Sequence, residues 1–306
     1  MSTTVVSPPS TKSIVGVAQV VAAAALFGTA GTVQALAPTS AAPASVGAAR
    51  LLLGGVGLLV VAPIAGGDRR RALRLWRTWP GLLCGLLTAS FQILFFFGVA
   101  HAGVAVGTLV TIGSGPIFAG CFARVMLREP ISRPWLLSTL VAVVGLGLLV
   151  GPVGHFGTDG LLAALGAGLC YSLYTVLIRR AVIGGESATT LIASAFSLGG
   201  LALLPVLVLS SNEWLNSGHG LAAALWLGFA TTTAAYLLFG RGLTKIPAGP
   251  VTTLVLTEPI VATMLGVTVL GERLAFWQVF GLLLVCAGVG VQGWSQSFPD
   301  RGESLA

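Results

Sequence analysis

Two ionisable side chains lie inside long apolar stretches of this sequence, where a charge is costly. Glu258 directly precedes Pro259, about a third of the way into the apolar stretch 249–274, and Arg50 lies within the apolar stretch 44–65. A charge at the centre of a membrane-spanning helix costs ~2.5–3.5 kcal/mol on insertion scales, so such residues tend to face a protein interior or a wet cavity. We therefore interpret Glu258 and Arg50 as candidates for contact with a solute or a proton.

Each of these two residues has two interpretations. Glu258 either carries a proton or binds an amine, since apolar surroundings favour its neutral form and an Arg50 contact favours its carboxylate, or it only satisfies backbone groups at the Pro259 break. Arg50 either binds a substrate carboxylate or braces helices through hydrogen bonds. Counted from opposite ends of a ~30 Å hydrocarbon core, they lie at depths of ~10 Å and ~13 Å, which predicts an axial separation of only ~6 Å.

Uncharged polar residues near the expected membrane midplane are further candidates for the site. A Ser or Thr hydroxyl in a helix can also bond its own backbone, so each one alone has a purely local interpretation. Together they predict a mostly apolar cavity with a few orienting groups, which suits a small amphipathic solute. The candidates are Gln92, Thr111, Ser114, Tyr171, Tyr174 and Thr232.

Pro116 and Pro259 interrupt apolar stretches at corresponding places. Proline lacks the amide hydrogen that would bond one turn back, so the carbonyls of Ile112 and Val255 lose their usual partners. Interrupted helices at matched positions of two halves indicate a transport site, where they serve gating. The alternative is a static packing bend.

Composition places these residues in a membrane. The chain has 306 residues, of which 55% are hydrophobic and 8% charged, whereas a soluble domain holds about 25% charged residues. Four cysteines fall in the apolar stretches without CxxC spacing, so we expect neither a disulfide nor a metal site. The composition therefore predicts an all-α integral membrane protein.

Ten stretches are long enough to span a bilayer as helices. A span needs about 20 apolar residues, and the expected spans are 14–34, 44–65, 79–100, 105–126, 135–151, 160–178, 188–209, 220–240, 249–270 and 276–294. The first is followed by Ala35-Leu36-Ala37, which resembles a signal-peptidase site. We interpret it as a retained helix, because its removal would leave the span at 160–178 without a counterpart.

The chain has an internal duplication. A shift of 143 positions places Pro116 under Pro259 and Glu129 under Glu272. The two halves, 14–151 and 160–294, each contain an odd number of helices, which predicts two inverted-topology repeats between a disordered tail at 1–13 and a second tail at 295–306. We expect the two glutamates to accept amide hydrogen bonds where the fifth and tenth helices begin. We also expect those two glycine-rich helices to pack together.

Positive charge predicts the orientation. Of the 16 Lys and Arg residues, all except Arg50 and Arg273 fall in segments on the same side as the amino terminus. Short cytoplasmic loops hold an excess of Lys and Arg, so both termini are expected in the cytoplasm. The basic balance thus reflects topology and predicts no nucleic-acid partner.

With its spans in this order, the sequence resembles the EamA family of the drug/metabolite transporter superfamily. The resemblance rests on GAARLLLGG in the second span, TEPIVATMLGVTVLGERL in the ninth and SGPIFAGCFARVMLREP in the fourth. It implies ten helices around a central cavity and the transport of small metabolites, often the export of amino acids or related compounds. One departure is Gly115 where the second half has Glu258, so any acidic function is asymmetric.

These observations predict a secondary transporter of the inner membrane. We expect it to export a small amino-acid-like or amphipathic solute by alternating access, with proton coupling as an option, as a functional monomer without a cofactor. An enzyme is disfavoured because the sequence has no HExxH, GxSxG or phosphate-binding GxxxxGK[ST] motif. The remaining alternative is a transport-inactive sensor or assembly subunit with the same fold.

Overall fold

A computed structural model describes residues 11–38, 42–151 and 157–298, which form helices and contain no strand. Ten of its helices are long and apolar enough to cross a membrane, as predicted. Residues 1–10 and 299–306 of the predicted tails lie outside the described residues.

The spanning helices are α1 (Thr11–Leu36), α2 (Pro43–Val61), α4 (Trp79–Ala102), α5 (Val104–Met126), α6 (Arg133–Val150), α7 (Thr158–Ile183), α8 (Ala188–Ala202) with α9 (Leu204–Leu209), α10 (Gly218–Leu225) continuing to α11 (Ala235–Leu243), α12 (Ala248–Leu254) with α13 (Thr257–Val269), and α14 (Phe276–Ser297). A short α3 (Arg69–Leu75) joins α2 to α4.

Side-chain caps fix where several spans begin. A Ser or Thr just before the helix accepts a hydrogen bond from a backbone amide of the first turn and so satisfies a group that the helix leaves free. Thr78 caps α4, Ser132 caps α6, Ser187 caps α8 and Ser217 caps α10. These caps define the end of the bundle at which each helix enters the apolar layer.

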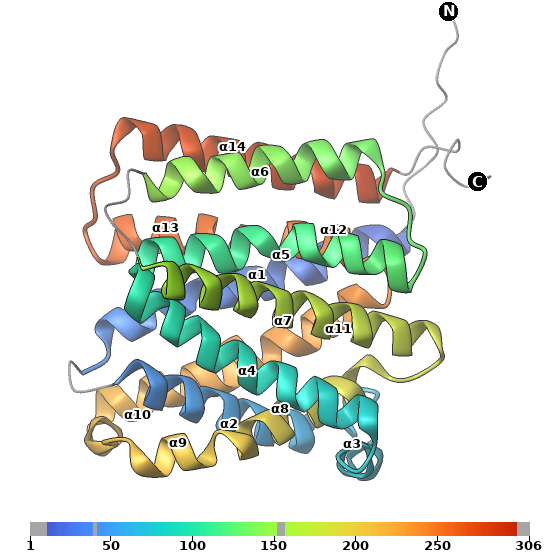
Figure 1. The fold of residues 1–306 in the computed structure, drawn as a ribbon, viewed down its shortest axis with the longest axis vertical. Coiled ribbons are helices and arrows are strands. Elements are labelled where there is room, and N and C mark those ends of the chain that lie inside the picture. The colour runs from blue at the N-terminus through green and yellow to red at the C-terminus, as the bar shows by residue number, and fades with distance from the viewer. Residues whose placement is uncertain (1–10, 39–41, 152–156, 299–306) are drawn as a thin grey trace, which may run out of the picture.

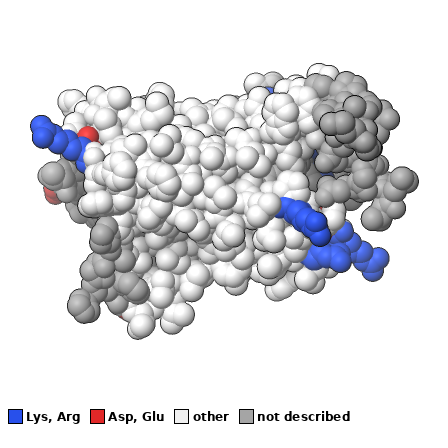
Figure 2. All heavy atoms as spheres, turned by 90° about the horizontal axis from the view of Figure 1, so that it is seen from above, with Lys and Arg blue, Asp and Glu red and all other residues white. Residues whose placement is uncertain are grey.

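The helices lie side by side in one bundle, with the start of α1 and the end of α14 at the same end (Figure 1). The pair α6 and α14 forms one edge of the bundle, and α2 with α8 lies near the opposite edge. On the face shown in Figure 2, coloured charged residues lie at the two ends, and the band between them carries none. Large apolar side chains such as Phe276 and Val125 are exposed. This surface is that of a multi-pass membrane protein.

Glycine brings α6 and α14 into close contact, which confirms the predicted packing of the fifth and tenth helices. A Cβ atom on Gly281 would lie 2.6 Å from the carbonyl oxygen of Gly145, and one on Gly145 would lie 2.7 Å from that of Gly281. Only a residue without a Cβ allows the two backbones to approach this closely. Gly147 and Gly290 face open space instead, so only part of the glycine pattern serves this contact.

We expect Gly281→Val to disrupt the contact between α6 and α14. A valine side chain would overlap the α6 backbone, and overpacking in a close-packed interface costs about 1–3 kcal/mol or more. The thermal unfolding temperature of the detergent-purified protein should therefore fall by several degrees. Gly290→Val on the same helix is the matched control, because nothing lies within 4 Å of its Cβ position. Equal unfolding temperatures for the two variants would contradict this account.

The contacts between the two halves are reciprocal. Helices α4 and α5 of the first half both pack on α7, the first helix of the second half, while α11 and α13 of the second half both pack on α1. Such an exchange is consistent with two repeats inverted relative to each other. It also places α1 and α7 in the middle of the bundle.

The helix interruption predicted at two prolines occurs at one of them. The ninth span is divided into α12 and α13 just before Glu258 and Pro259, and the Glu258 amide donates to the Val255 carbonyl at 2.8 Å. This bond satisfies the carbonyl that Pro259 leaves without its usual partner. By contrast, α5 continues through Pro116 as one helix.

Candidate functional site

A cavity between the two halves gathers most of the predicted site residues. It encloses about 870 Å³ of space free of atoms, its opening included. Its wall combines groups from α1, α2, α4, α5, α7, α11, α12 and α13. Five predicted residues line it: Arg50, Gln92, Thr111, Tyr171 and Glu258.

The eighth span holds the side chain of Arg50 through a hydrogen bond. Its Nε donates to Thr232 Oγ1 at 3.1 Å, and Thr232 Oγ1 in turn donates to the Leu227 carbonyl at 2.9 Å. Thr232 belongs to a π-helical segment, Trp226–Ala234, in which the bond from residue i to i−5 replaces the usual α-helical one. Thr232 is fully buried and is absent from the cavity wall, so it positions Arg50 from behind.

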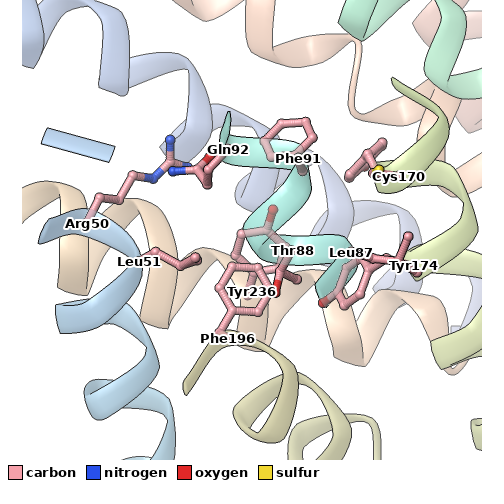
Figure 3. Close-up of a pocket in the computed structure, with 11 residues that line it drawn as sticks. Arg50, Leu51, Leu87, Thr88, Phe91, Gln92, Cys170, Tyr174, Phe196 and Tyr236 are labelled. Atoms are coloured by element: carbon pink, nitrogen blue, oxygen red, sulfur yellow. The ribbon is translucent and has the colours of Figure 1, made fainter. Parts of the chain in front are cut away.

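The guanidinium of Arg50 points toward Gln92 on α4 (Figure 3). Gln92 is buried, and its Nε2 donates to the Gly47 carbonyl of α2 at 3.1 Å. The bond to Thr232 occupies the Nε edge of Arg50. This leaves the four N–H donors of its two Nη groups for other partners.

Glu258 lies in the first turn of α13, half-buried, and lines the same cavity. Helix α1 approaches it closely at Gly28, where a Cβ atom would lie 2.6 Å from the Glu258 carbonyl oxygen. The only ion pairs within 4.0 Å among the described residues are Arg71–Glu186 and Arg179–Glu129. Glu258 and Arg50 thus line one cavity and form no ion pair with each other.

Ser114 and Tyr174 lie apart from this wall. Ser114 donates to the Thr111 carbonyl at 3.3 Å, and a Cβ on Gly168 of α7 would collide with its hydroxyl, so Ser114 lies where α5 packs on α7. Tyr174 lines a smaller pocket that adjoins the cavity, together with Arg50, Gln92 and Tyr171 (Figure 3). Gly115, the counterpart of Glu258, lies against the ring of Tyr171.

Sequence reasoning missed much of the wall. Aromatic residues are the largest group among the missed residues, and aromatic side chains in an apolar span look alike whether they face lipid or a cavity. Gln34 could have been predicted as a wall residue, because it is a polar side chain at the end of the first span. The wall also contains Phe27, Gln34, Phe95, Phe96, Thr108, Tyr236 and Thr252.

The cavity reaches toward the end of the bundle opposite to the start of α1 and the end of α14. Gln34, which lines it and is exposed, lies near the end of α1, and Gly47 lies near the start of α2 at the same end. Thr108 lies near the start of α5, which begins there as well. The cavity wall therefore includes residues close to this surface.

At the other end, Glu129 joins the two halves. Its Oε1 accepts from Arg179 Nε at 3.1 Å, and its Oε2 accepts from the Ala248 amide, at the start of α12, at 3.0 Å. Arg179 Nη1 also donates to the Leu243 carbonyl at 2.8 Å. We expected Glu129 to cap the helix that follows it, but Ser132 takes that role and Glu129 caps α12 instead.

Ten spanning helices around a largely apolar cavity with a few polar and charged groups define a class of multi-pass membrane protein. Comparison with known proteins identifies the class more closely. The model of the EamA-like transporter family matches the chain twice, over residues 14–151 and 158–292. The chain belongs to the EamA-like transporter family, which confirms the resemblance seen in its sequence.

Relatives and a solved structure agree with this assignment. The chain is 38% identical to YwfM of Bacillus subtilis, named an uncharacterized transporter, over 88% of this chain and 90% of YwfM. It is 29% identical to RhtA of Escherichia coli K12, named a threonine/homoserine exporter, over 88% of each. A crystal structure with 18% identity has a TM-score of 0.77 and covers 90% of this chain and 95% of that one, which shows a shared fold.

Proposed function

We propose that the chain is a secondary transporter that exports a small amino-acid-like solute across the inner membrane. One observation carries the proposal: a cationic and an anionic side chain, Arg50 and Glu258, line one cavity without forming an ion pair. In apolar surroundings each of these charges strongly favours a partner of opposite charge. A zwitterion supplies both partners, with a carboxylate for Arg50 and an ammonium for Glu258.

The relatives support the same solute class. RhtA is named as an exporter of threonine and homoserine, both amino acids, and the chain aligns with it over 88% of its length. The aromatic wall at Phe27, Phe91 and Tyr236 suits the aliphatic part of an amino acid. A role in transport rather than catalysis agrees with the family.

We propose that both termini lie in the cytoplasm, on the basis of the excess of Lys and Arg at that end. With this orientation the cavity faces outward, and the contacts of Glu129 close its cytoplasmic side. Transport by alternating access requires these contacts to open. The cavity would then close on the outer side and open to the cytoplasm, with the break before Pro259 as a hinge.

Breaking the Glu129 contacts should favour the inward-facing state. Glu129→Gln keeps the size of the side chain but removes its charge, and a loss of about 1–2 kcal/mol shifts a two-state equilibrium by about 5–30-fold. We would place a single cysteine at Thr252, in the cavity wall, in a background without the four native cysteines. In inside-out vesicles, an impermeant maleimide should label it at least about fivefold faster in the variant.

The matched control is Glu186→Gln, which breaks the exposed ion pair with Arg71 at the same end of the bundle. This ion pair holds α3 near the start of α8 and does not touch α12. It should leave the labelling rate unchanged. If Glu129→Gln also leaves it unchanged, Glu129 does not close the cytoplasmic side.

The proposed function is tested by flux in proteoliposomes. Purified protein should give saturable counterflow of a labelled small amino acid, both with and without a pH gradient, and empty liposomes should give none. If no flux is detected for a panel of amino acids, nucleosides and cationic drugs, the proposal fails and a sensor or assembly role is favoured.

A further inference from the structure

A second, smaller pocket continues from the main cavity into the bundle. Its space free of atoms is about 390 Å³ with its opening included, less than half of that of the main cavity. Its wall shares Arg50, Phe91, Gln92, Tyr171 and Tyr236 with the main cavity, so the two spaces adjoin. A solute held by Arg50 can therefore extend a short group into the smaller pocket, which we call the inner pocket.

Two phenol groups of the inner pocket have no hydrogen-bond partner. Tyr174 is 2% exposed, and neither its hydroxyl nor that of Tyr171 has a partner among residues 11–38, 42–151 and 157–298. Leaving a buried polar group unsatisfied costs about 1–3 kcal/mol. The neighbouring Thr88, in contrast, contacts the Ala195 carbonyl at 3.0 Å. Among the buried polar side-chain atoms of this wall, the two phenol oxygens are the ones that lack a partner among the described residues.

Aromatic rings pack against one another in the wall of the inner pocket. Phe196 lies 5.9 Å from the Tyr174 ring and 4.1 Å from the Tyr236 ring, measured between centroids. Leu51 and Leu87 complete an apolar boundary. No described residue bonds either phenol, and the inner pocket adjoins the main cavity, so a polar group that extends from the main cavity would supply the missing partner.

We propose that the inner pocket is the side-chain subsite of the transport site, and that it takes a short, uncharged side chain bearing a hydroxyl or an amide. The inference rests on the proposed function, because Arg50 and Glu258 must hold the carboxylate and the ammonium of an amino acid. A hydroxyl or an amide of that solute then bonds the phenols of Tyr174 and Tyr171.

The charges of the wall exclude other side chains. Arg50 is the only formally charged residue that lines the inner pocket. In this proposal its guanidinium is already paired with the substrate carboxylate. A second charge on the solute would be buried without a partner, which is strongly unfavourable. A long or aromatic side chain would collide with the rings of Tyr174 and Phe196, so the subsite selects by size as well.

Threonine and valine provide the sharpest test, since they have the same shape and differ in one hydroxyl. We would measure how strongly each competes with labelled substrate in proteoliposomes. In the parent protein, threonine should compete about 2–10-fold better than valine, the range expected from one neutral hydrogen bond of about 0.5–1.5 kcal/mol. Tyr174→Phe, which removes only the hydroxyl, should reduce this ratio toward one.

Ser194→Ala is the matched control. The Ser194 hydroxyl is also buried and has no partner among the described residues, but it lines neither pocket. Its removal should leave the ratio unchanged. If Tyr174→Phe is not recovered as a folded protein, Tyr171→Phe provides the same test from the other phenol.

The outcomes separate the two proposals. An unchanged ratio in a folded tyrosine variant overturns the subsite, as does equal competition by threonine and valine in the parent. A uniform loss of affinity for both solutes also overturns it, because the phenol would then act only in packing or with water. If the parent transports no amino acid, the proposed function itself fails.

Discussion

Transport by a Glu258→Gln variant is expected to fall by about 10- to 100-fold. A charge-assisted hydrogen bond contributes about 1.5–3 kcal/mol, and a factor of ten corresponds to about 1.4 kcal/mol. Glutamine keeps the size of the side chain, so the break before Pro259 should persist while the anion that binds the ammonium is lost. The measurement is the initial rate of amino-acid counterflow in proteoliposomes.

The same variant also tests proton coupling. Glutamine cannot exchange a proton, so any stimulation of transport by a pH gradient should disappear in Glu258→Gln. Glu272→Gln is the matched control, because Glu272 follows the same span but lies exposed at the end of the bundle. Unchanged transport and pH dependence in Glu258→Gln would rule out both a proton-carrying and an ammonium-binding role.

Arg50→Gln should weaken binding of a zwitterion by a similar factor, about 10- to 100-fold in KM. The variant loses the cation that binds the carboxylate as well as the bond to Thr232. Arg50→Lys retains the charge but not the planar, forked set of donors, so we expect an intermediate KM. The KM values of a labelled amino acid in proteoliposomes measure both effects.

The alternative role of Arg50 predicts a different result. If Arg50 only braces α2 against the eighth span, Arg50→Gln should lower the thermal unfolding temperature and leave KM unchanged. Thr232→Val provides a comparison, because it removes the acceptor behind Arg50 but leaves the guanidinium in place. An unchanged KM in Arg50→Gln would refute carboxylate binding.

The membrane architecture was accessible to sequence reasoning because the bilayer imposes it. Apolar length alone locates ten spans, and two isolated charges in them point to the interior. The expectation that Glu258 and Arg50 lie at similar heights in the membrane required only their depths along the helices. Depth follows directly from position in the sequence, since each residue of a helix adds 1.5 Å.

Rotation about each helix was not accessible in the same way. Lipid is as apolar as a protein interior, so a hydrophobic pattern does not tell which face of a span meets a neighbour. Hence Phe27, Phe95 and Phe96 were missed as wall residues, and Ser114 was expected in the site although it lies between α5 and α7. The π-helical turn that places Thr232 behind Arg50 also has no signature in the sequence.

Contacts between distant loops were equally out of reach. Glu129 stands just before a helix, and local rules assign it to that helix. In the structure it caps α12 and pairs with Arg179, both in the other half of the chain. Only the relative placement of the two halves determines this partner.

Binding of a zwitterion and of its two blocked derivatives tests the central claim most directly. Affinities of the purified parent protein, Arg50→Gln and Glu258→Gln would be measured by calorimetry for an amino acid, its methyl ester and its N-acetyl form. We predict that the parent binds both derivatives at least about tenfold more weakly, that Arg50→Gln no longer distinguishes the ester, and that Glu258→Gln no longer distinguishes the N-acetyl form. Equal binding of all three compounds by the parent would contradict a site built on these two charges.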